Sequence, residues 1–129
     1  MKRRISVIIP TYNEKENITK LIYSINKNSD DLVQEIIIVD DNSPDGTWAI
    51  VKKLMAKTKK LKLIRRMKER GLPSAISEGI KNAKSDYVLW MDSDLSHPSG
   101  LIRTMVKFIP KYDVISASRY VKNGHDKRQ

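Results

Sequence analysis

The sequence contains no cysteine, and only 6% of its 129 residues are aromatic. A chain without thiols has neither a disulfide scaffold nor a thiolate metal site, and it fits a reducing compartment. The few aromatic residues are not interleaved with the basic ones, which disfavours a nucleic-acid site built on stacked bases. We therefore expect no nucleic-acid partner.

Long hydrophobic runs are also missing. The longest uninterrupted aliphatic run covers residues 36–39, far short of the roughly 20 residues that a membrane span needs. The apolar stretch near the amino terminus ends at Pro10, so we do not expect a signal peptide.

Several well-known site motifs do not occur. The segment "PTYNEKEN" after the first predicted strand has no glycine, which disfavours a Rossmann dinucleotide site, and no P-loop sequence is present. The chain has two histidines, His97 and His125, and no G-x-S-x-G sequence, so a serine hydrolase lacks support.

Positive charge is abundant, with a formal net charge of +10 and eight basic residues between Lys57 and Arg70. Such a surface suits nucleic acid, an anionic membrane or a polyphosphate ligand. On charge alone, a solvated, lysine-rich face is the favoured interpretation. Charge alone does not decide between these functions.

Apolar runs and helical stripes alternate along the chain and predict a single α/β domain over residues 1–129. The predicted strands cover residues 5–9, 35–40, 61–64, 87–91 and 113–117. Between them we predict helices, the first capped by Asn13, the second opened by Pro44 and the third with Ile76 and Ile80 facing inward. This alternation favours a mostly parallel sheet with helices on both faces.

Unusual polar residues gather where the predicted strands end. The segments are "PTYNE", "DDNSPDGT", "DSDLSHP" and "SRY", after strands one, two, four and five. In open parallel sheets, ligands bind outside the carboxyl ends of the strands. We therefore expect these four loops to form one cleft.

The most specific of these segments places Asp92 and Asp94 directly after a buried strand. Like charges this close repel each other unless a positive group lies between them. A hard divalent cation such as Mg²⁺ or Mn²⁺ takes carboxylate ligands and keeps positions open for phosphates. The alternative is an acidic turn that caps the helix after Pro98.

Five segments together resemble the family 2 glycosyltransferases, in particular the dolichyl- (polyprenyl-) phosphate mannose synthase branch. They are "SVIIPTYNEKENI", "EIIIVDDNSPDGT", "IRRMKERGLPSA", "DYVLWMDSDLSHP" and "ISASRYVKNG". The resemblance runs from residue 5 to residue 124 in the order and spacing of the family. It implies a GT-A (Rossmann-like) nucleotide-diphospho-sugar transferase fold.

The resemblance also implies roles for residues at the strand ends. Pro10, Tyr12 and Glu14 would hold the nucleoside, and Val39 and Asp41 would contact the base. A carboxylate suits guanine, which offers two N–H donors, better than uracil with one. Tyr12 as a packing residue and Glu14 as a first-turn helix acid remain alternatives.

A second set of residues would act on the diphosphate and the metal. Asp92, Ser93 and Asp94 would form the metal and diphosphate loop. Ser96 stands where many relatives have glutamine, and would be a weaker metal ligand. Arg119 would offer a forked donor to phosphate, unless it is a solvated strand-end charge.

The implied activity is the inverting transfer of mannose from GDP-mannose to dolichyl or polyprenyl phosphate, with Mg²⁺ or Mn²⁺, by a protein associated peripherally with the cytoplasmic face of a membrane. The catalytic domain of the family continues past the position of Arg119, so this chain is expected to be C-terminally truncated and to hold the donor-binding half. Other possibilities are another sugar nucleotide such as UDP-glucose, a metal-dependent nucleotidyltransferase, or a non-catalytic basic binding domain.

Overall fold

The structure is a computed structural model that describes residues 4–93, 101–106 and 114–117. Within these ranges strands and helices alternate along the chain, as the sequence predicts. In order they are β1 Ile5–Thr11, α1 Ile18–Ser29, β2 Val33–Asp40, α2 Thr47–Leu54, β3 Leu61–Arg65, α3 Leu72–Asn82, β4 Tyr87–Met91, α4 Leu101–Val106 and β5 Val114–Ala117. No helix among the described residues is both long enough and apolar enough to cross a membrane.

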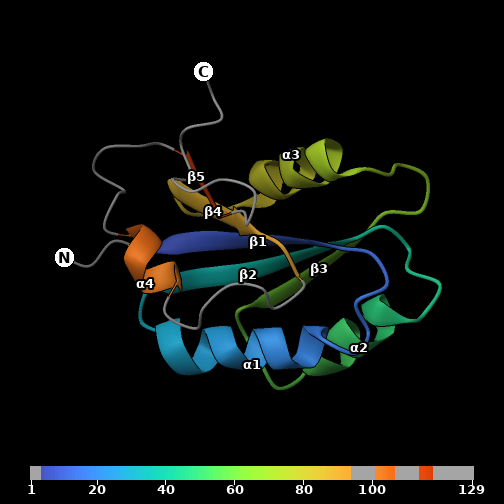
Figure 1. Cartoon of the computed structure of the whole chain (residues 1–129), viewed down its shortest axis with the longest axis horizontal. Helices are drawn as coiled ribbons and strands as arrows, with labels where there is room; N and C mark the ends of the chain where they lie inside the picture. Colours follow the sequence, from blue (N-terminus) through green and yellow to red (C-terminus); the bar gives the residue numbers. More distant parts are fainter. Residues whose placement is uncertain (1–3, 94–100, 107–113, 118–129) are drawn as a thin grey trace.

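The five strands form one sheet in the order β3-β2-β1-β4-β5, and every neighbouring pair is parallel. Helices α1, α2 and α4 lie over one face and α3 lies over the other (Figure 1). The predicted parallel sheet with helices on both faces is therefore confirmed. Since all strands run the same way, the loops that follow them emerge along one edge of the sheet.

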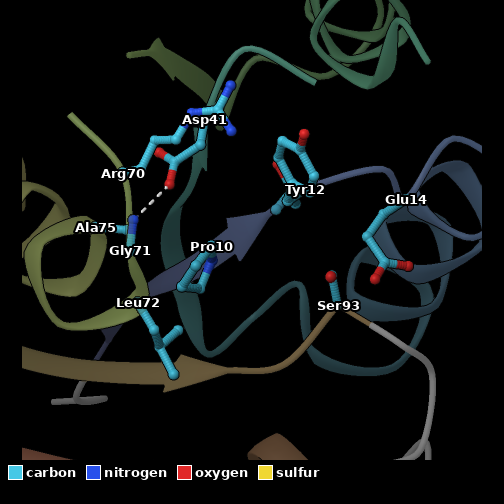
Figure 2. Close-up of a pocket in the computed structure, with 10 residues that line it drawn as sticks. Pro10, Tyr12, Glu14, Asp41, Arg70, Gly71, Leu72, Ala75 and Ser93 are labelled. Atoms are coloured by element: carbon cyan, nitrogen blue, oxygen red, sulfur yellow. Dashed lines mark hydrogen bonds between the residues drawn. The ribbon is translucent and has the colours of Figure 1, made fainter. Parts of the chain in front are cut away.

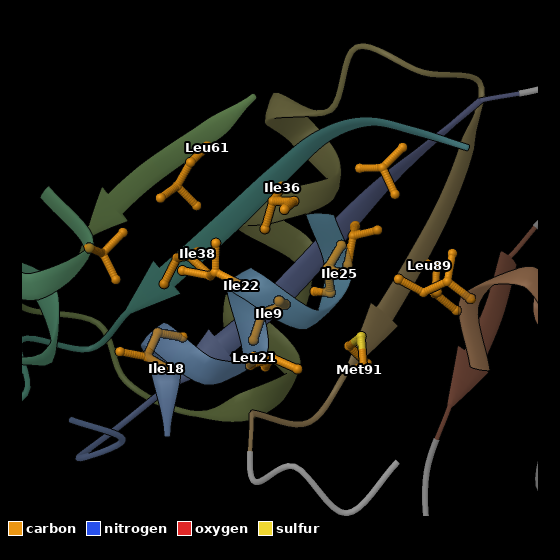
Figure 3. Packing of buried hydrophobic residues seen from close by; sticks show 14 of the residues in the cluster. Ile9, Ile18, Leu21, Ile22, Ile25, Ile36, Ile38, Leu61, Leu89 and Met91 are labelled. Carbon is orange, nitrogen blue, oxygen red and sulfur yellow. The ribbon is translucent and has the colours of Figure 1, made fainter. Parts of the chain in front are cut away.

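The larger half of the core lies between the sheet and α1 (Figure 3). Helix α1 turns a stripe of apolar residues toward the strands, spaced at i, i+3, i+4 and i+7. These residues are Ile18, Leu21, Ile22 and Ile25, each at most 5% exposed. Burying one such side chain contributes roughly 1.5–3 kcal/mol, so this stripe fixes α1 against the sheet.

On the opposite face, α3 packs close to the sheet through small residues. Ala75 is 1% exposed, and a Cβ added at Gly79 would lie 2.5 Å from Ile8 Cγ2. The prediction that Ile80 faces inward is wrong, because its side chain is 42% exposed. Helical periodicity places Ala75 and Gly79 against the sheet, while Ile76 is half-buried.

Two predicted helix starts are also wrong. Asn13 does not cap α1, because it lies in a loop with a left-handed φ of 55° and the helix begins only at Ile18. Pro44 does not open α2, which begins at Thr47 after Gly46 at a φ of 86°. Instead, the Thr47 N–H donates to Asp45 Oδ1 at 3.0 Å. Hydrogen bonds between the loop after β1 and the loop after β2 override both local signals.

Candidate functional site

A cleft of about 430 Å³ opens at the carboxyl ends of β1, β2 and β4, beside the first turn of α3 (Figure 2). Ten residues line it. They are Pro10, Thr11, Tyr12, Glu14, Asp41, Arg70, Gly71, Leu72, Ala75 and Ser93. Five of the predicted site residues, from three separate strand ends, thus lie around one cleft: Pro10, Tyr12, Glu14, Asp41 and Ser93.

The floor between β1 and β2 is held by Asp40, which is fully buried. Its Oδ1 accepts hydrogen bonds from Thr11 Oγ1 at 2.6 Å and from Ser43 Oγ at 2.7 Å. Its Oδ2 accepts a bond from the Ser43 N–H at 2.8 Å. Asp40 therefore joins the two loops, while its neighbour Asp41 turns toward the cleft.

The loops after β1 and β2 are joined further by side-chain to backbone bonds. Ser43 Oγ accepts a bond from the Asn13 N–H at 2.9 Å, and Thr47 Oγ1 accepts one from the Glu14 N–H at 3.0 Å. Asp45 Oδ2 accepts a bond from the Lys15 N–H at 3.1 Å. Since these bonds use the backbone, the side chains that line the cleft stay available.

Burial would raise the pKa of Asp45, but the hydrogen bonds from Thr47 and Lys15 outweigh it and lower that pKa. Asp45 is therefore ionised near neutral pH and holds the two loops together as a charged acceptor. The "DDNSPDGT" segment thus does two jobs. Asp40 and Asp45 build the walls, and Asp41 faces the cleft.

Asp41 is paired with Arg66, and both side chains are nearly buried. Arg66 Nε donates to Asp41 Oδ1 at 2.7 Å, and Arg66 Nη2 donates to Oδ2 at 3.0 Å. The Gly71 N–H gives Oδ2 a second bond at 3.0 Å. The hydrogen bonds to Asp41 raise the pKa of the Arg66 guanidinium. This bidentate pair fixes the orientation of the carboxylate.

Three donors occupy most of the acceptor capacity of Asp41. A carboxylate has about four lone-pair sites, and Oδ2 already accepts two bonds while Oδ1 accepts one. One site on Oδ1 remains. The arrangement suits a single N–H donor of a base, and it does not fit the expectation that Asp41 accepts both donors of guanine.

Arg66 also ties the start of α3 to the cleft. Its Nη1 donates to Ser74 Oγ at 2.9 Å and its Nη2 donates to the Gly71 carbonyl at 3.1 Å. The residues from Arg70 to Leu72 are thereby held beside Asp41. Gly71 adopts a φ of 112°, which residues other than glycine rarely adopt.

At the opposite wall, Asp92 follows β4 directly and is half-buried, and Ser93 is 6% exposed and lines the cleft. Oxygen donors of this kind fit a hard divalent cation. Residues 4–93, 101–106 and 114–117 contain no cluster of three or more histidine or acidic residues that could hold a metal. The predicted ligands Asp94 and Ser96, and the predicted phosphate contact Arg119, lie outside the described residues.

The structure places Val39 differently from the prediction. Its side chain is fully buried and packs with Ile8, Ile37 and Ala75 in the core under α3. A side chain enclosed there does not reach a base in the cleft. Alternation along β2 turns the Val39 side chain toward the face of the sheet that α3 covers. The chain reaches the cleft only at Asp41, after the strand has ended.

Sequence reasoning missed the segment after β3. Arg66, Arg70, Gly71 and Leu72 all contribute to the cleft or its support, yet no polar loop was assigned to this strand end. The two arginines lie in the basic run and in the segment "IRRMKERGLPSA", but neither was given a role. The rule that all carboxyl ends of a parallel sheet meet at one edge predicts that the segment after β3 reaches the cleft, but not which of its residues face it.

Comparison with known proteins finds relatives of this chain. The family described as glycosyl transferase family 2 matches residues 6–129. A dolichol-phosphate mannosyltransferase from Pyrococcus furiosus is 45% identical over 122 residues, which cover 94% of this chain and 34% of that protein.

Two solved structures have the same fold. The mannosyltransferase PcManGT from Pyrobaculum calidifontis, in complex with GDP-Man and Mn²⁺, aligns with a TM-score of 0.75 and 27% identity, over 89% of this chain and 34% of that one. S. aureus TarS in complex with UDP-GlcNAc aligns with a TM-score of 0.68 and 32% identity, over 84% of this chain and 31% of that one. The chain spans about a third of the length of each of these three proteins.

Proposed function

The chain belongs to glycosyl transferase family 2 and has the GT-A fold, and on this premise we propose that it forms the nucleotide-sugar-binding part of a metal-dependent, inverting mannosyltransferase. The donor is GDP-mannose and the acceptor is a dolichyl or polyprenyl phosphate. A relative that is 45% identical is a dolichol-phosphate mannosyltransferase, and a structural neighbour binds GDP-Man; both support this choice.

The observation that carries the proposal is the convergence of four side chains on one cleft. Tyr12, Glu14, Asp41 and Ser93 come from three strand ends and line a space of about 430 Å³, a usual size for a small-molecule site. Tyr12 offers a flat ring to the base and Asp41 an acceptor to a base N–H. Glu14 suits the ribose hydroxyls, and Ser93 suits the diphosphate.

A divalent metal completes the proposed site. Asp92 follows β4 beside Ser93, and we assign it as a ligand together with Asp94 and, more weakly, Ser96. The neighbour that binds GDP-Man also holds Mn²⁺, which supports Mn²⁺ or Mg²⁺. When bound, such a cation neutralises charge on the departing diphosphate.

The reaction needs little acid–base chemistry from the protein. An oxygen of the acceptor phosphate forms a bond to the anomeric carbon of mannose while the bond from that carbon to the GDP oxygen breaks, so the configuration inverts. The acceptor is already anionic near neutral pH, since the second pKa of a phosphate monoester is about 6. The chain's own contribution is to bind the donor and orient the anomeric carbon.

We further place this chemistry at the cytoplasmic face of a membrane, with peripheral association. The proposed acceptor is a lipid whose phosphate lies at a membrane surface. The net charge of +10 favours attraction to anionic lipid headgroups.

Calorimetry tests the donor and metal together. GDP-mannose should bind in the presence of Mn²⁺, and EDTA should remove most of the binding. Asp94→Asn should bind in Mn²⁺ as weakly as wild type does in EDTA. Asp86→Asn is the matched control, because Asp86 is exposed and directly precedes β4, at the end of the strand away from the cleft.

Three results would contradict parts of the proposal. Equal affinity of Asp94→Asn and wild type in Mn²⁺ would remove the metal role. Tighter binding of a UDP-sugar, such as that held by the TarS neighbour, would change the donor but leave the family in place. Release of pyrophosphate from a nucleoside triphosphate would indicate a nucleotidyltransferase.

A further inference from the structure

We propose that the outer edge of β3 binds an extended, acidic peptide of a partner protein as an additional strand of the sheet. Strand β3, Leu61–Arg65, is last in the sheet order, and among the described residues it pairs only with β2 (Figure 1). None of its residues lines the cleft, so the inference goes beyond the proposed function and does not depend on it. Free backbone groups and unpaired positive charge together define the partner.

The backbone groups of β3 point alternately toward β2 and away from it. The Ile36 N–H donates to the Lys60 carbonyl at 2.9 Å, and the Arg66 N–H donates to the Asp40 carbonyl at 2.8 Å. Residues 60 and 66 thus face β2, and so do 62 and 64, because successive residues of a strand alternate. The backbone groups of the odd-numbered residues therefore lie on the outer edge.

Leu63 is at the centre of this outer edge. Its N–H and carbonyl have no hydrogen-bond partner within residues 4–93, 101–106 and 114–117. An added strand uses one such donor and one such acceptor at every second residue. The side chains of Leu63 and Ile64 are half-buried and pack on opposite faces of the sheet. Each leaves apolar surface beside which an apolar side chain of the partner can pack.

Positive charge surrounds the same edge. Residues 46–68 include nine basic side chains and no acidic one. Four of the nine already bond to acceptors within the protein, and they are Lys60, Lys62, Arg65 and Arg66. The other five are exposed and have no ion pair or hydrogen bond in the part of the chain that the structure describes; they are Lys52, Lys53, Lys57, Lys59 and Lys68.

Two of the five unpaired lysines lie beside the outer edge of β3. Lys59 is in the turn that leads into the strand. Lys52 follows Trp48 by one turn of α2, so the two side chains share a face of that helix. The Trp48 ring contacts β3, because its centre lies 3.4 Å from Arg65 Cζ. Lysines at an edge oppose pairing with a second copy, where like charges would meet, and they favour an acidic strand.

A peptide strand fits this edge better than a nucleic acid or an anionic membrane. Phosphodiester oxygens would satisfy the lysines and the outward N–H groups, but they offer no donor to the Leu63 carbonyl. A strand supplies a carbonyl for each N–H and an N–H for each carbonyl. The free acceptor beside free lysines therefore indicates a peptide with apolar residues at its centre and acidic residues on both sides.

NMR titration with one peptide tests the strand pairing. The probe is acetylated and amidated Glu-Glu-Val-Val-Val-Glu-Glu. The amide signals of Leu63 and Arg65 should shift on binding, and hydrogen exchange at the Leu63 amide should slow. The same peptide with N-methylated valines keeps its charge but loses backbone donors. It should bind about tenfold more weakly, because at least one backbone hydrogen bond is lost.

Charge reversal gives a second readout. Lys52→Glu combined with Lys59→Glu should weaken peptide binding about tenfold, because two surface ion pairs become repulsions. Lys20→Glu combined with Lys81→Glu is the matched control. It changes the net charge equally at exposed positions on α1 and α3 and should bind the peptide as wild type does. GDP affinity should stay unchanged in both double variants, since none of these lysines lines the cleft.

Three outcomes would overturn the proposal. Equal binding of the methylated and unmethylated peptides would reduce the interaction to charge attraction without strand pairing. Tighter binding to phosphatidylglycerol vesicles or to a DNA duplex than to the peptide, lost in the Lys52→Glu and Lys59→Glu double variant alone, would assign the edge to a membrane or to nucleic acid. A wild-type chain that binds GDP but not the peptide would refute the edge site and leave the proposed function intact.

Discussion

Glu35 and Asp41 are two buried carboxylates on opposite ends of β2, and each meets a cation from β3 or the residue after it. Glu35 Oε1 accepts a bond from Lys62 Nζ at 2.8 Å, and Asp41 Oδ1 accepts one from Arg66 Nε at 2.7 Å. Their exposures are 1% and 8%. By burial and charge pairing alone, the two positions look alike.

Their surroundings differ. Glu35 Oε2 also accepts bonds from Ser6 Oγ at 2.6 Å and from the Lys84 N–H, and Ser6 Oγ in turn accepts the Ser85 N–H at 3.2 Å. The loop before β4 thus closes the amino end of the sheet. At the carboxyl end, Asp41 keeps one acceptor site beside exposed Tyr12 and Arg70. A buried ion pair therefore does not mark a site; the open polar surface next to it does.

The largest expected effect comes from removing the cation at the carboxyl end. Arg66→Met should lower the free energy of unfolding by about 3–5 kcal/mol, because it leaves the Asp41 charge buried without its partner. Urea unfolding measures this, and Arg66→Lys should recover part of the loss. A change below about 1 kcal/mol would mean that water reaches Asp41 and that the two ends differ less than the hydrogen bonds indicate.

Neutralising the carboxylate at the amino end should affect stability alone. Glu35→Gln should lower the free energy of unfolding by about 1–3 kcal/mol, because the bond from Lys62 loses its charged acceptor. Affinity for GDP should stay at the wild-type value, since Glu35 is at the far end of β2. If Glu35→Gln weakens GDP binding as much as Asp41→Asn does, the division between a structural end and a binding end is wrong.

Tyr12→Ala should have the opposite pattern, a loss of GDP affinity without a loss of stability. It should weaken GDP binding by roughly 1–3 kcal/mol, the contribution of one base stacked on an aromatic ring, and leave urea unfolding unchanged because the ring is 44% exposed. Tyr12→Phe keeps the ring and should bind nearly as wild type. A loss of stability in Tyr12→Ala would show that the ring packs instead of binding.

The smallest expected effect is on how stability depends on pH in acid. Burial would raise the pKa of Glu35, but hydrogen bonds from Lys62, Ser6 and the Lys84 N–H outweigh it and lower that pKa below the ordinary 4.5. A carboxyl group whose pKa is lower in the folded state than in the unfolded state stabilises the fold at pH values above its unfolded-state pKa. This stabilisation is lost as the pH falls through the folded-state pKa. Below pH 4.5, wild type should therefore lose stability more steeply than Glu35→Gln, and parallel curves would contradict this.

Much of the fold could be predicted from local patterns. The five apolar runs match the five strands, and the stripe of Ile18 to Ile25 matches α1. Alternation of strands and helices then leaves a parallel sheet as the favoured arrangement. Since parallel strands end at one edge, the sequence is enough to predict that Tyr12, Asp41 and Ser93 share one cleft.

The rest depends on contacts between residues far apart in sequence. Asp40 and Asp41 are adjacent and chemically identical, yet Thr11 and Ser43 bury one while Arg66 orients the other toward the cleft. Asn13 and Pro44 carry helix-start signals that the bonds between their two loops override. The sequence by itself therefore determined the order of strands and helices, the family and the set of residues at the strand ends. The tertiary structure alone decided which carboxylate is structural, that Val39 is core, that Arg66 supports the cleft and that Arg70 lines it. The reason is that most of the contacts that set burial and hydrogen bonding here join residues 25 or more positions apart.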